Sequence, residues 1–474
     1  MKSGFLLLAL LGASSYAQTG TFAQTGSMIS PRVGHTATLL PNGKVLIAGG
    51  PSATLELYDP GTGTFTATGK TASPIVVSAT LLPDGRVLLI ESRNAELYDP
   101  STGTVRATGS MVDGQGGNSP CAPARKCGAT LLTNGKVLMT SSGNPQLYDP
   151  STGAFTLTGP YANVYTHNDG FQTTVTLLPS GEVLFARDAQ YVRNYSAELY
   201  DSTTNTFRLT GVMVSYLLGR TTTLLVNGKV LRAGGYVDFD YYQKEEQYDP
   251  ATGMFTATGD MITPRSDHDA VLLPDGTVLV TGGRGSDIGP AAYLASAELY
   301  DSSTGTFTAT GNMPVRRAYH TATVLNDGRV LITGGISPVG TGSFNTDWIQ
   351  SSAEIYTPPV LIPAPALFSM SGDGQGQGAI WHAQTGQIAS AGNRAVAGEA
   401  LSMYTTSLPD GGVIPPQIAV GGRLAEVLYF GASGYPGYNQ VNFRVPNGVV
   451  PGLAVPVRLT YLGRSSNAIS IGVQ

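Results

Sequence analysis

Apolar and polar positions along the chain follow one pattern that is repeated seven times. Each copy contains two apolar residues, a short turn with Gly and a Val-Leu pair, as in LLPNGKVL, LLPDGRVL and LLVNGKVL. The copies begin at residues 39, 81, 131, 177, 224, 272 and 324. Most of the turns carry Asn-Gly or Asp-Gly, which tolerate the positive φ of a tight hairpin. The pattern therefore predicts seven β-hairpins.

Two further strands follow each hairpin. The third is an ELYDP-like run ending at Tyr58, Tyr98, Tyr148, Tyr200, Tyr248, Tyr300 and Tyr356, and the fourth is a TGTFTATG-like run. A four-stranded unit of about 45–50 residues is typical of a kelch propeller blade. The seventh unit lacks its fourth strand, whereas residues 20–28, GTFAQTGSM, form a fourth strand without the other three. We therefore predict an all-β, seven-bladed propeller over residues 18–358, closed by its N-terminal strand.

The remainder of the chain differs from the repeats. Residues 359–366 form a Pro-rich linker, and residues 367–474 contain short alternating strands such as ALSMYTTSL and QVNFRVP between Gly/Pro turns. Roughly seven short strands in about 110 residues predict an immunoglobulin-like β-sandwich.

The N-terminus predicts export. Residues 1–17 combine a Lys, an apolar run and small residues before Ala17, as in a signal peptide, so we expect a protein secreted by Sec export, extracellular or at the cell surface. Cys121 and Cys127 are the two cysteines, and we expect them to form a loop disulfide in that compartment. Charged residues are 12% of the chain and the net charge is -5, which gives no basic surface for nucleic acid. No later apolar run is long enough for membrane insertion.

The phrases PRVGHTATLLPNGKVLIAGG, PRSDHDAVLLPDGTVLVTGG and RRAYHTATVLNDGRVLITGG resemble kelch repeats, in particular the central domain of galactose oxidase-like proteins. The last 110 residues, with GEALSMYTTSLPDG and SSNAISIGV, resemble an uncharacterised C-terminal family of secreted acidobacterial proteins with an immunoglobulin-like (IPT/TIG-like) appearance. The first resemblance implies the fold. It implies no particular function, because propellers host many activities. The second implies a bacterial exported protein and no known chemistry.

An RxxH phrase precedes the first strand of three blades. Its residues are Arg32 and His35, Arg265 and His268, and Arg317 and His320. Because ring closure makes these blades neighbours, one interpretation is that the three imidazoles converge on a metal. A motif at one repeat position is, however, what a structural contact between blades produces. We expect Arg to bond carbonyl groups of the next blade and His to close a strand end, and we assign no metal.

The resemblance to galactose oxidase also implies a specific copper site. That family holds copper with a Tyr-His pair, a second Tyr crosslinked to Cys, and a His of the C-terminal domain. Tyr319 and His320 match the pair, whereas the equivalent strand starts carry Asp267 and Gly34, and both cysteines lie in one loop. His382 is the C-terminal histidine. Because this chemistry needs the whole set, we assign no catalytic residue and no cofactor, and keep a copper oxidase of primary alcohols or sugars as the alternative.

Long loops are expected on one face of the propeller and carry many aromatic residues. Exposed rings suit sugar faces, and the alternative is that several of them pack the loops against each other. The ligand-binding candidates are Tyr319, His320, Trp348, Tyr241, Tyr242 and Tyr165. In blades 2 to 4, Glu91, Arg187 and Asp188 stand where other blades have Gly-Gly, which marks either a polar patch at the channel mouth or ordinary repeat decay. We expect a monomeric carbohydrate-binding protein, with an extracellular protein-protein scaffold as a further alternative.

Overall fold

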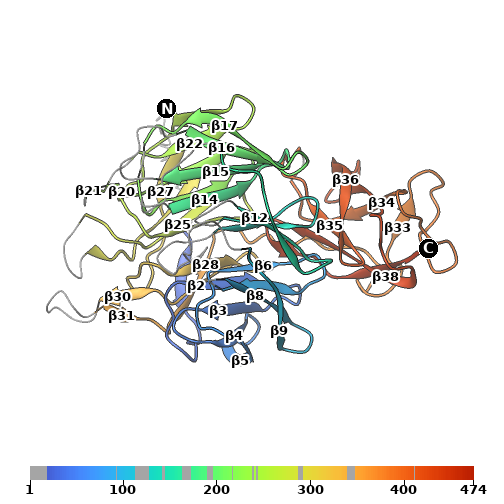
Figure 1. Ribbon diagram of the computed structural model, residues 1–474, viewed down its shortest axis with the longest axis horizontal. Coiled ribbons are helices and arrows are strands. Elements are labelled where there is room, and N and C mark those ends of the chain that lie inside the picture. The colour runs from blue at the N-terminus through green and yellow to red at the C-terminus, as the bar shows by residue number, and fades with distance from the viewer. Residues whose placement is uncertain are drawn as a thin grey trace, which may run out of the picture.

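The computed structural model describes residues 19–474, apart from residues 92, 113–127, 141–144, 163–171, 189–195, 216, 238–239, 242–243, 287–291, 339–346 and 410. Seven four-stranded antiparallel sheets form a propeller, and a further sheet forms the C-terminal domain beside it (Figure 1). The first strands of successive blades contact each other, and that of the seventh blade contacts that of the first. The predicted all-β fold with seven blades is confirmed.

The strands of the blades have the following bounds. Blade 1 contains β2 (His35–Leu39), β3 (Val45–Gly49), β4 (Thr54–Asp59) and β5 (Thr64–Lys70). Blade 2 contains β6 (Ser78–Leu81), β7 (Val87–Ile90), β8 (Asn94–Asp99) and β9 (Thr104–Ser110). Blade 3 contains β10 (Ala129–Leu131), β11 (Val137–Met139), β12 (Gln146–Asp149) and β13 (Ala154–Leu157). Blade 4 contains β14 (Gln172–Leu177), β15 (Val183–Asp188), β16 (Ser196–Asp201) and β17 (Thr206–Val212).

The remaining blades carry two extra hairpins. Blade 5 contains β18 (Thr221–Leu224), β19 (Val230–Ala233), β22 (Glu246–Asp249) and β23 (Met254–Ala257), with the hairpin β20 (Tyr236–Val237) and β21 (Asp240–Tyr241). Blade 6 contains β24 (Asp269–Leu272), β25 (Val278–Thr281), β26 (Ala297–Asp301) and β27 (Thr306–Ala309). Blade 7 contains β28 (Thr321–Val324), β29 (Val330–Thr333) and β32 (Ala353–Thr357), with the hairpin β30 (Ile336–Pro338) and β31 (Asp347–Ile349).

The ring closes through the N-terminal strand β1 (Thr21–Gln24). It pairs antiparallel with β32, in a register that runs from Thr21 opposite Thr357 to Gln24 opposite Glu354. Blade 7 thus obtains its fourth strand from the other end of the propeller sequence. The closure removes the two free sheet edges that an open ring would leave.

The repeated Tyr and Phe explain why the blades share one sequence pattern. Each third-strand Tyr is at most 1% exposed, and in six blades it packs on the Phe opposite it in the fourth strand, as Tyr58 does on Phe65 with ring centres 4.8 Å apart. In blade 2, Tyr98 lies opposite Val105 instead. In six blades the hydroxyl of the third-strand Tyr also bonds a Thr of the preceding blade, as Tyr58 does with Thr25 at 2.9 Å. Tyr200 instead donates to Asn205 of its own blade. One side chain therefore packs its own blade and joins it to the next.

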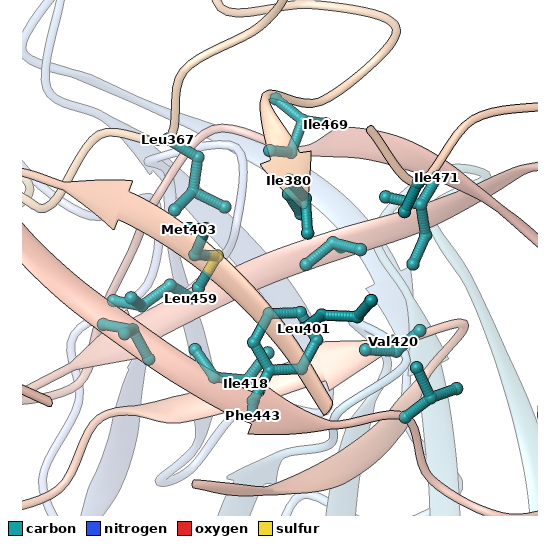
Figure 2. Packing of buried hydrophobic residues seen from close by; sticks show 14 of the residues in the cluster. Leu367, Ile380, Leu401, Met403, Ile418, Val420, Phe443, Leu459, Ile469 and Ile471 are labelled. Carbon is teal, nitrogen blue, oxygen red and sulfur yellow. The ribbon is translucent and has the colours of Figure 1, made fainter. Parts of the chain in front are cut away.

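The C-terminal domain is a sandwich-like sheet that curls on itself. Its strands are β33 (Ile380–His382), β34 (Ala400–Thr405), β35 (Gln417–Val420), β36 (Arg423–Ala432), β37 (Asn439–Arg444), β38 (Gly452–Tyr461), β39 (Arg464–Ser465) and β40 (Ile469–Val473). Residues that alternate along the strands, among them Leu401, Met403, Ile418 and Phe443, enclose its core (Figure 2).

The C-terminal domain covers one end of the propeller channel. Arg458, Thr460 and Leu462 face first-strand residues such as Thr222 and Ala322 across a cavity of about 610 Å³. The hairpins β20–β21 and β30–β31 lie on the opposite side of the propeller (Figure 1). Any ligand that enters the channel from the loops therefore meets the residues at the starts of the first strands.

Candidate functional site at the mouth of the propeller channel

A residue one or two positions before the first strand has a positive φ in blades 1, 5, 6 and 7. These residues are Gly34 (64°), Gly219 (76°), Asp267 (52°) and Tyr319 (56°). The backbone N–H of Asp267 donates to the carbonyl of Gly219 at 3.1 Å, and that of Tyr319 donates to the carbonyl of Asp267 at 3.0 Å. Non-Gly residues in this conformation are strained, and such strain clusters at functional sites.

Asp267 and Tyr319 form a polar cluster with Arg284. The Tyr319 hydroxyl lies near both charged groups: Asp267 raises its pKa and Arg284 lowers it. Arg284 comes from the loop after the second strand of blade 6, and its Cζ lies 5.8 Å from the ring centre of Tyr293. We call Asp267, Arg284, Tyr293 and Tyr319 the channel-mouth cluster. The first, second and fourth of these residues are half-buried, so they combine fixed positions with access to solvent.

Burial and the charge of Asp267 raise the pKa of Tyr319 well above that of a free phenol. The Tyr319 hydroxyl is therefore protonated throughout the physiological range and serves as a donor. The cluster thus presents a carboxylate acceptor, a guanidinium donor and a neutral hydroxyl beside aromatic rings.

The three histidines of the RxxH phrases lie between blades. The Nε2 atoms of His35, His268 and His320 lie 2.9 Å from the hydroxyl oxygens of Thr333, Thr221 and Thr281, each in the preceding blade. All three side chains are buried. Burial, with the nearby Arg32 and Arg317 charges, lowers the pKa of His35 to about 3, so that imidazole is neutral.

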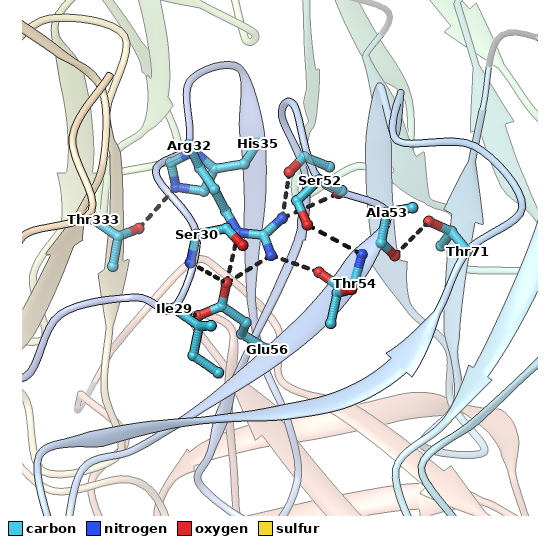
Figure 3. Close-up of polar contacts among 11 residues, drawn as sticks. Ile29, Ser30, Arg32, His35, Ser52, Ala53, Thr54, Glu56, Thr71 and Thr333 are labelled. Carbon is cyan, nitrogen blue, oxygen red and sulfur yellow. Dashed lines mark hydrogen bonds and ion pairs between the residues drawn. The ribbon is translucent and has the colours of Figure 1, made fainter. Parts of the chain in front are cut away.

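The arginines of these phrases bond the carbonyl groups of their own blade rather than of the next blade, which differs from the expected arrangement. Arg32 is fully buried, and its guanidinium donates to the carbonyls of Gly49, Ser52 and Thr54 and to Glu56 at 2.7 Å (Figure 3). Glu56 also accepts from the backbone N–H groups of Ile29 and Ser30. Arg265 with Glu298 and Arg317 with Glu354 repeat this arrangement at 2.6 Å. The hydrogen-bond donors of each Arg side chain thus find their acceptors within the same blade, because the segment before the first strand folds back over the third strand of that blade.

In blade 5, Arg220 performs the same role from the position that blades 1, 6 and 7 give to His. It donates to the carbonyl of Gly234 at 2.7 Å and to Glu246 at 2.6 Å. Glu246 also pairs with Arg232.

In blades 5, 6 and 7 the Gly-Gly pair is explained by the RxxH phrase of the following blade. The N–H groups of Gly235, Gly283 and Gly335 donate at 2.8 Å to the backbone carbonyls of Arg265, Arg317 and Arg32. A Cβ on the first glycine of these three pairs would lie within 3 Å of the same carbonyl and of the next His ring. Blade 1 is the exception, because blade 2 lacks the phrase and a Cβ on Gly49 would instead lie 2.9 Å from the Val76 carbonyl. Blades 2 to 4, which lack Gly-Gly, precede blades without an RxxH phrase. This complementarity was present in the sequence, but only a comparison of each blade with its successor reveals it.

Glu91 and Arg187 have separate partners. Glu91 accepts from the N–H of Ser73 at 2.9 Å, and burial together with the neighbouring Glu96 raises its pKa. Arg187 stacks on Tyr161, with its Cζ 3.2 Å from the ring centre, and burial raises the pKa of that phenol to about 12. The side chains of Asp188, Tyr241 and Trp348, and residues Cys121, Cys127, Tyr165 and Tyr242, lie outside the described part of the chain.

The structure also reveals a buried carboxyl that sequence reasoning missed. Glu245 is 1% exposed and stands where four other blades have alanine, at Ala95, Ala197, Ala297 and Ala353. Its Oε2 accepts from the N–H of Met261 at 3.3 Å, and its Oε1 has no hydrogen-bond partner among the described residues. Burial raises the pKa of Glu245 to about 7, although Arg220 opposes the shift. Aligning the repeats would have found this residue.

Glu245 should make the propeller less stable as the pH rises. Its folded pKa lies above the unfolded value, so the folded protein binds the extra proton between about pH 4.5 and 7 and loses that advantage as the pH increases through this window. We expect Glu245→Gln and Glu245→Ala to unfold at higher denaturant concentration than the parent at pH 8, by about 2 kcal/mol. At pH 4.5 the three proteins should differ much less. A parent and a Gln variant with parallel stability profiles between pH 4.5 and 8 would contradict this prediction.

Comparison with known proteins supports the fold. The chain is similar to a solved structure of a fungal alcohol oxidase of the AA5 family in complex with copper, with a TM-score of 0.60 and 16% sequence identity. The alignment covers 96% of this chain and 100% of that chain. No family model and no curated protein matches the sequence. At this identity the likeness shows a shared architecture, a galactose oxidase-like propeller with a C-terminal β domain.

The residues that the structure describes do not fit a copper centre. His382 lies in β33, where its Nδ1 is 2.5 Å from Glu399 and its Nε2 is 3.1 Å from the Asn393 carbonyl, both in the C-terminal domain. His320 points its Nε2 at Thr281, and the Tyr319 hydroxyl lies near the charged groups of Asp267 and Arg284. Outside the gaps given above, no three His, Cys, Asp or Glu side chains are arranged to hold a metal.

Proposed function

We propose that this chain is an exported, monomeric carbohydrate-binding protein whose propeller recognises its ligand at the channel-mouth cluster. The observation that carries the proposal is the half-buried Asp267, Tyr319 and Arg284 side chains, two of them on strained backbone at the open end of the channel. Sugar hydroxyl groups both donate and accept hydrogen bonds, so a carboxylate, a guanidinium and a phenol satisfy them in pairs. No helix in the described part of the chain is long and apolar enough to span a membrane.

The similarity to an alcohol oxidase does not lead us to propose oxidase activity. Tyr319 corresponds in type to the Tyr of the Tyr-His pair, but burial and the nearby Asp267 charge raise the pKa of its hydroxyl. A metal-bound phenolate would need that proton removed, which burial and the Asp267 charge oppose. The same groups favour a neutral ligand with several hydroxyl groups.

The test is glycan-array binding of the mature protein and of variants. We expect Asp267→Ala to weaken binding of a retained glycan at least about tenfold, and Tyr319→Phe to weaken it less, because each removes hydrogen bonds of about 1–2 kcal/mol. Asp275→Ala is the matched control, since Asp275 lies in the hairpin turn of the same blade, at the other end of the first strand.

Two outcomes would overturn the proposal. Near-stoichiometric copper uptake with peroxide release from primary alcohols would make the protein an oxidase. Retention of an extracellular protein, with no glycan bound, would make it a scaffold.

A further inference from the structure

The C-terminal domain carries a second group of exposed and half-buried aromatic rings, on the outer face of β33, β34, β37 and β36. Trp381 lies opposite Ser402, Ser402 opposite Asn442, and Asn442 opposite Tyr429, so these four side chains form one row across four neighbouring strands. Their neighbours in sequence, such as Ile380 and Met403, point into the core instead. At about 4.8 Å between strands, the row is about 14 Å long.

A second row runs beside the first. Tyr404 lies opposite Gln440, and Gln440 lies opposite Gly431, which leaves the β36 end of this row without a side chain. The ring of Tyr404 stands edge-on to those of Trp381, at 5.5 Å, and Tyr435, at 5.9 Å. Tyr435 is 64% exposed and Tyr429 is 44% exposed. The rings therefore contact each other edge-on at the protein surface and remain accessible to solvent, unlike rings packed in a core.

Uncharged polar groups occupy the middle of this face. The amide of Gln440 donates to Asn442 Oδ1 at 2.9 Å and lies 3.3 Å from the Ser402 hydroxyl. In the adjoining row Arg444 and Glu426 lie opposite each other and form an ion pair at 2.9 Å, so the two charges cancel. We call Trp381, Ser402, Tyr404, Tyr429, Tyr435, Gln440 and Asn442 the aromatic face.

We propose that the aromatic face is a second binding site, and that its ligand is a neutral polysaccharide. The C–H groups of sugar rings stack on aromatic rings, while the amides and the Ser hydroxyl can exchange their mutual hydrogen bonds for bonds to sugar hydroxyls. A polyanion does not suit the face, because its single guanidinium is already paired. A protein partner suits it less well, because the core of a protein interface is apolar whereas amides lie at the centre of this face. The length of the row favours a chain of sugars over a single one.

The aromatic face is separate from the channel-mouth cluster. Most residues of the C-terminal domain that face the propeller cavity, among them Gln417, Thr460 and Leu462, come from β35, β38 and the turn after β38. β36 contributes only Leu424, near its start, whereas Tyr429 lies five residues further along. Trp381 and Tyr404 come from β33 and β34, at the other end of the sheet order (Figure 1). Variants of one site therefore leave the other intact, and two sites on one chain would increase retention on a polymer through avidity.

The test is affinity electrophoresis of the full mature chain in gels that contain soluble β-glucan, xylan, galactomannan or polygalacturonate. We expect at least one of the three neutral polymers to retard the protein, and Trp381→Ala and Tyr435→Ala each to weaken that retardation at least about tenfold. Leu453→Ala is the control, because Leu453 is a comparably exposed apolar residue on β38. Asp267→Ala should keep the retardation that depends on Trp381.

The remaining outcomes each overturn the inference. They are the absence of retardation by all neutral polymers, retardation by polygalacturonate alone, and unchanged retardation in a Trp381→Ala/Tyr435→Ala double variant. Since Tyr435 is largely exposed, its substitution does not disturb the core, and a normal unfolding midpoint would exclude misfolding as the cause of a loss. If Asp267→Ala lost the retardation while the Trp381→Ala/Tyr435→Ala double variant kept it, the result would support binding at the channel-mouth cluster and reject binding at the aromatic face.

Discussion

Arg32→Met should destabilise the propeller by about 3–5 kcal/mol. The substitution leaves Glu56 buried with only its two backbone donors, and it leaves the carbonyls of Gly49, Ser52 and Thr54 without the guanidinium. Removing one partner of a buried ion pair costs this much because the remaining charge has lost both its partner and its water. The shift of the propeller's unfolding midpoint in denaturant measures the loss.

Arg86→Met is the matched control for that prediction. Arg86 pairs with Asp84 at 2.6 Å, as closely as Arg32 pairs with Glu56. The side chains of Arg86 and Asp84, however, are each about one-third exposed. Surface pairs of this kind contribute at most about 1 kcal/mol. Equal losses in the two variants would mean that the buried RxxH arginines do not stabilise the blades, and their repetition would then need another explanation.

The sequence predicted the fold well because the same pattern of strand and turn residues occurs in all seven repeats. The Asx-Gly turns define hairpins, and the third-strand Tyr with the fourth-strand Phe defines how six of the seven blades pack. The unpaired strand at residues 20–28 indicated where the ring closes, and β1 pairs with β32 along its whole length. Each of these features depends on residues close in sequence or on a count of strands.

The candidate sites were harder to predict because they depend on contacts between blades. Asp267 stood out only as a mismatch to a copper-binding family, yet in the structure its charge lies close enough to the Tyr319 hydroxyl of the neighbouring blade to raise the pKa of that group. Arg284 gave no signal, since it lies in a loop that follows the second strand. On the aromatic face, alternation along β34 predicts that Tyr404 points outward, but its proximity to Tyr435 follows from a turn between β36 and β37.

The contact between blades also explains why the first glycine of the Gly-Gly pair is needed. In blade 7, Gly334 has a φ of 62°, and a Cβ at this position would lie 2.5 Å from the Arg32 carbonyl and 2.7 Å from the His35 ring. The carbonyl cannot move aside freely, because it accepts from the N–H of Gly335 at 2.8 Å. This contact joins blade 7 to blade 1, where the ring closes.

Gly334→Ala should therefore cost about 2–5 kcal/mol, from the unfavourable φ and from overpacking against the next blade. Gly135→Ala is the control that separates the two causes. Gly135 has a φ of 83°, but a Cβ there meets no atom within 4 Å, so its variant should lose only about 1–2 kcal/mol. Denaturant unfolding of both variants measures the difference. If Gly334→Ala lost no more than Gly135→Ala, the Gly-Gly pair would reflect turn conformation alone, and the match between Gly-Gly and the following RxxH phrase would have no steric cause.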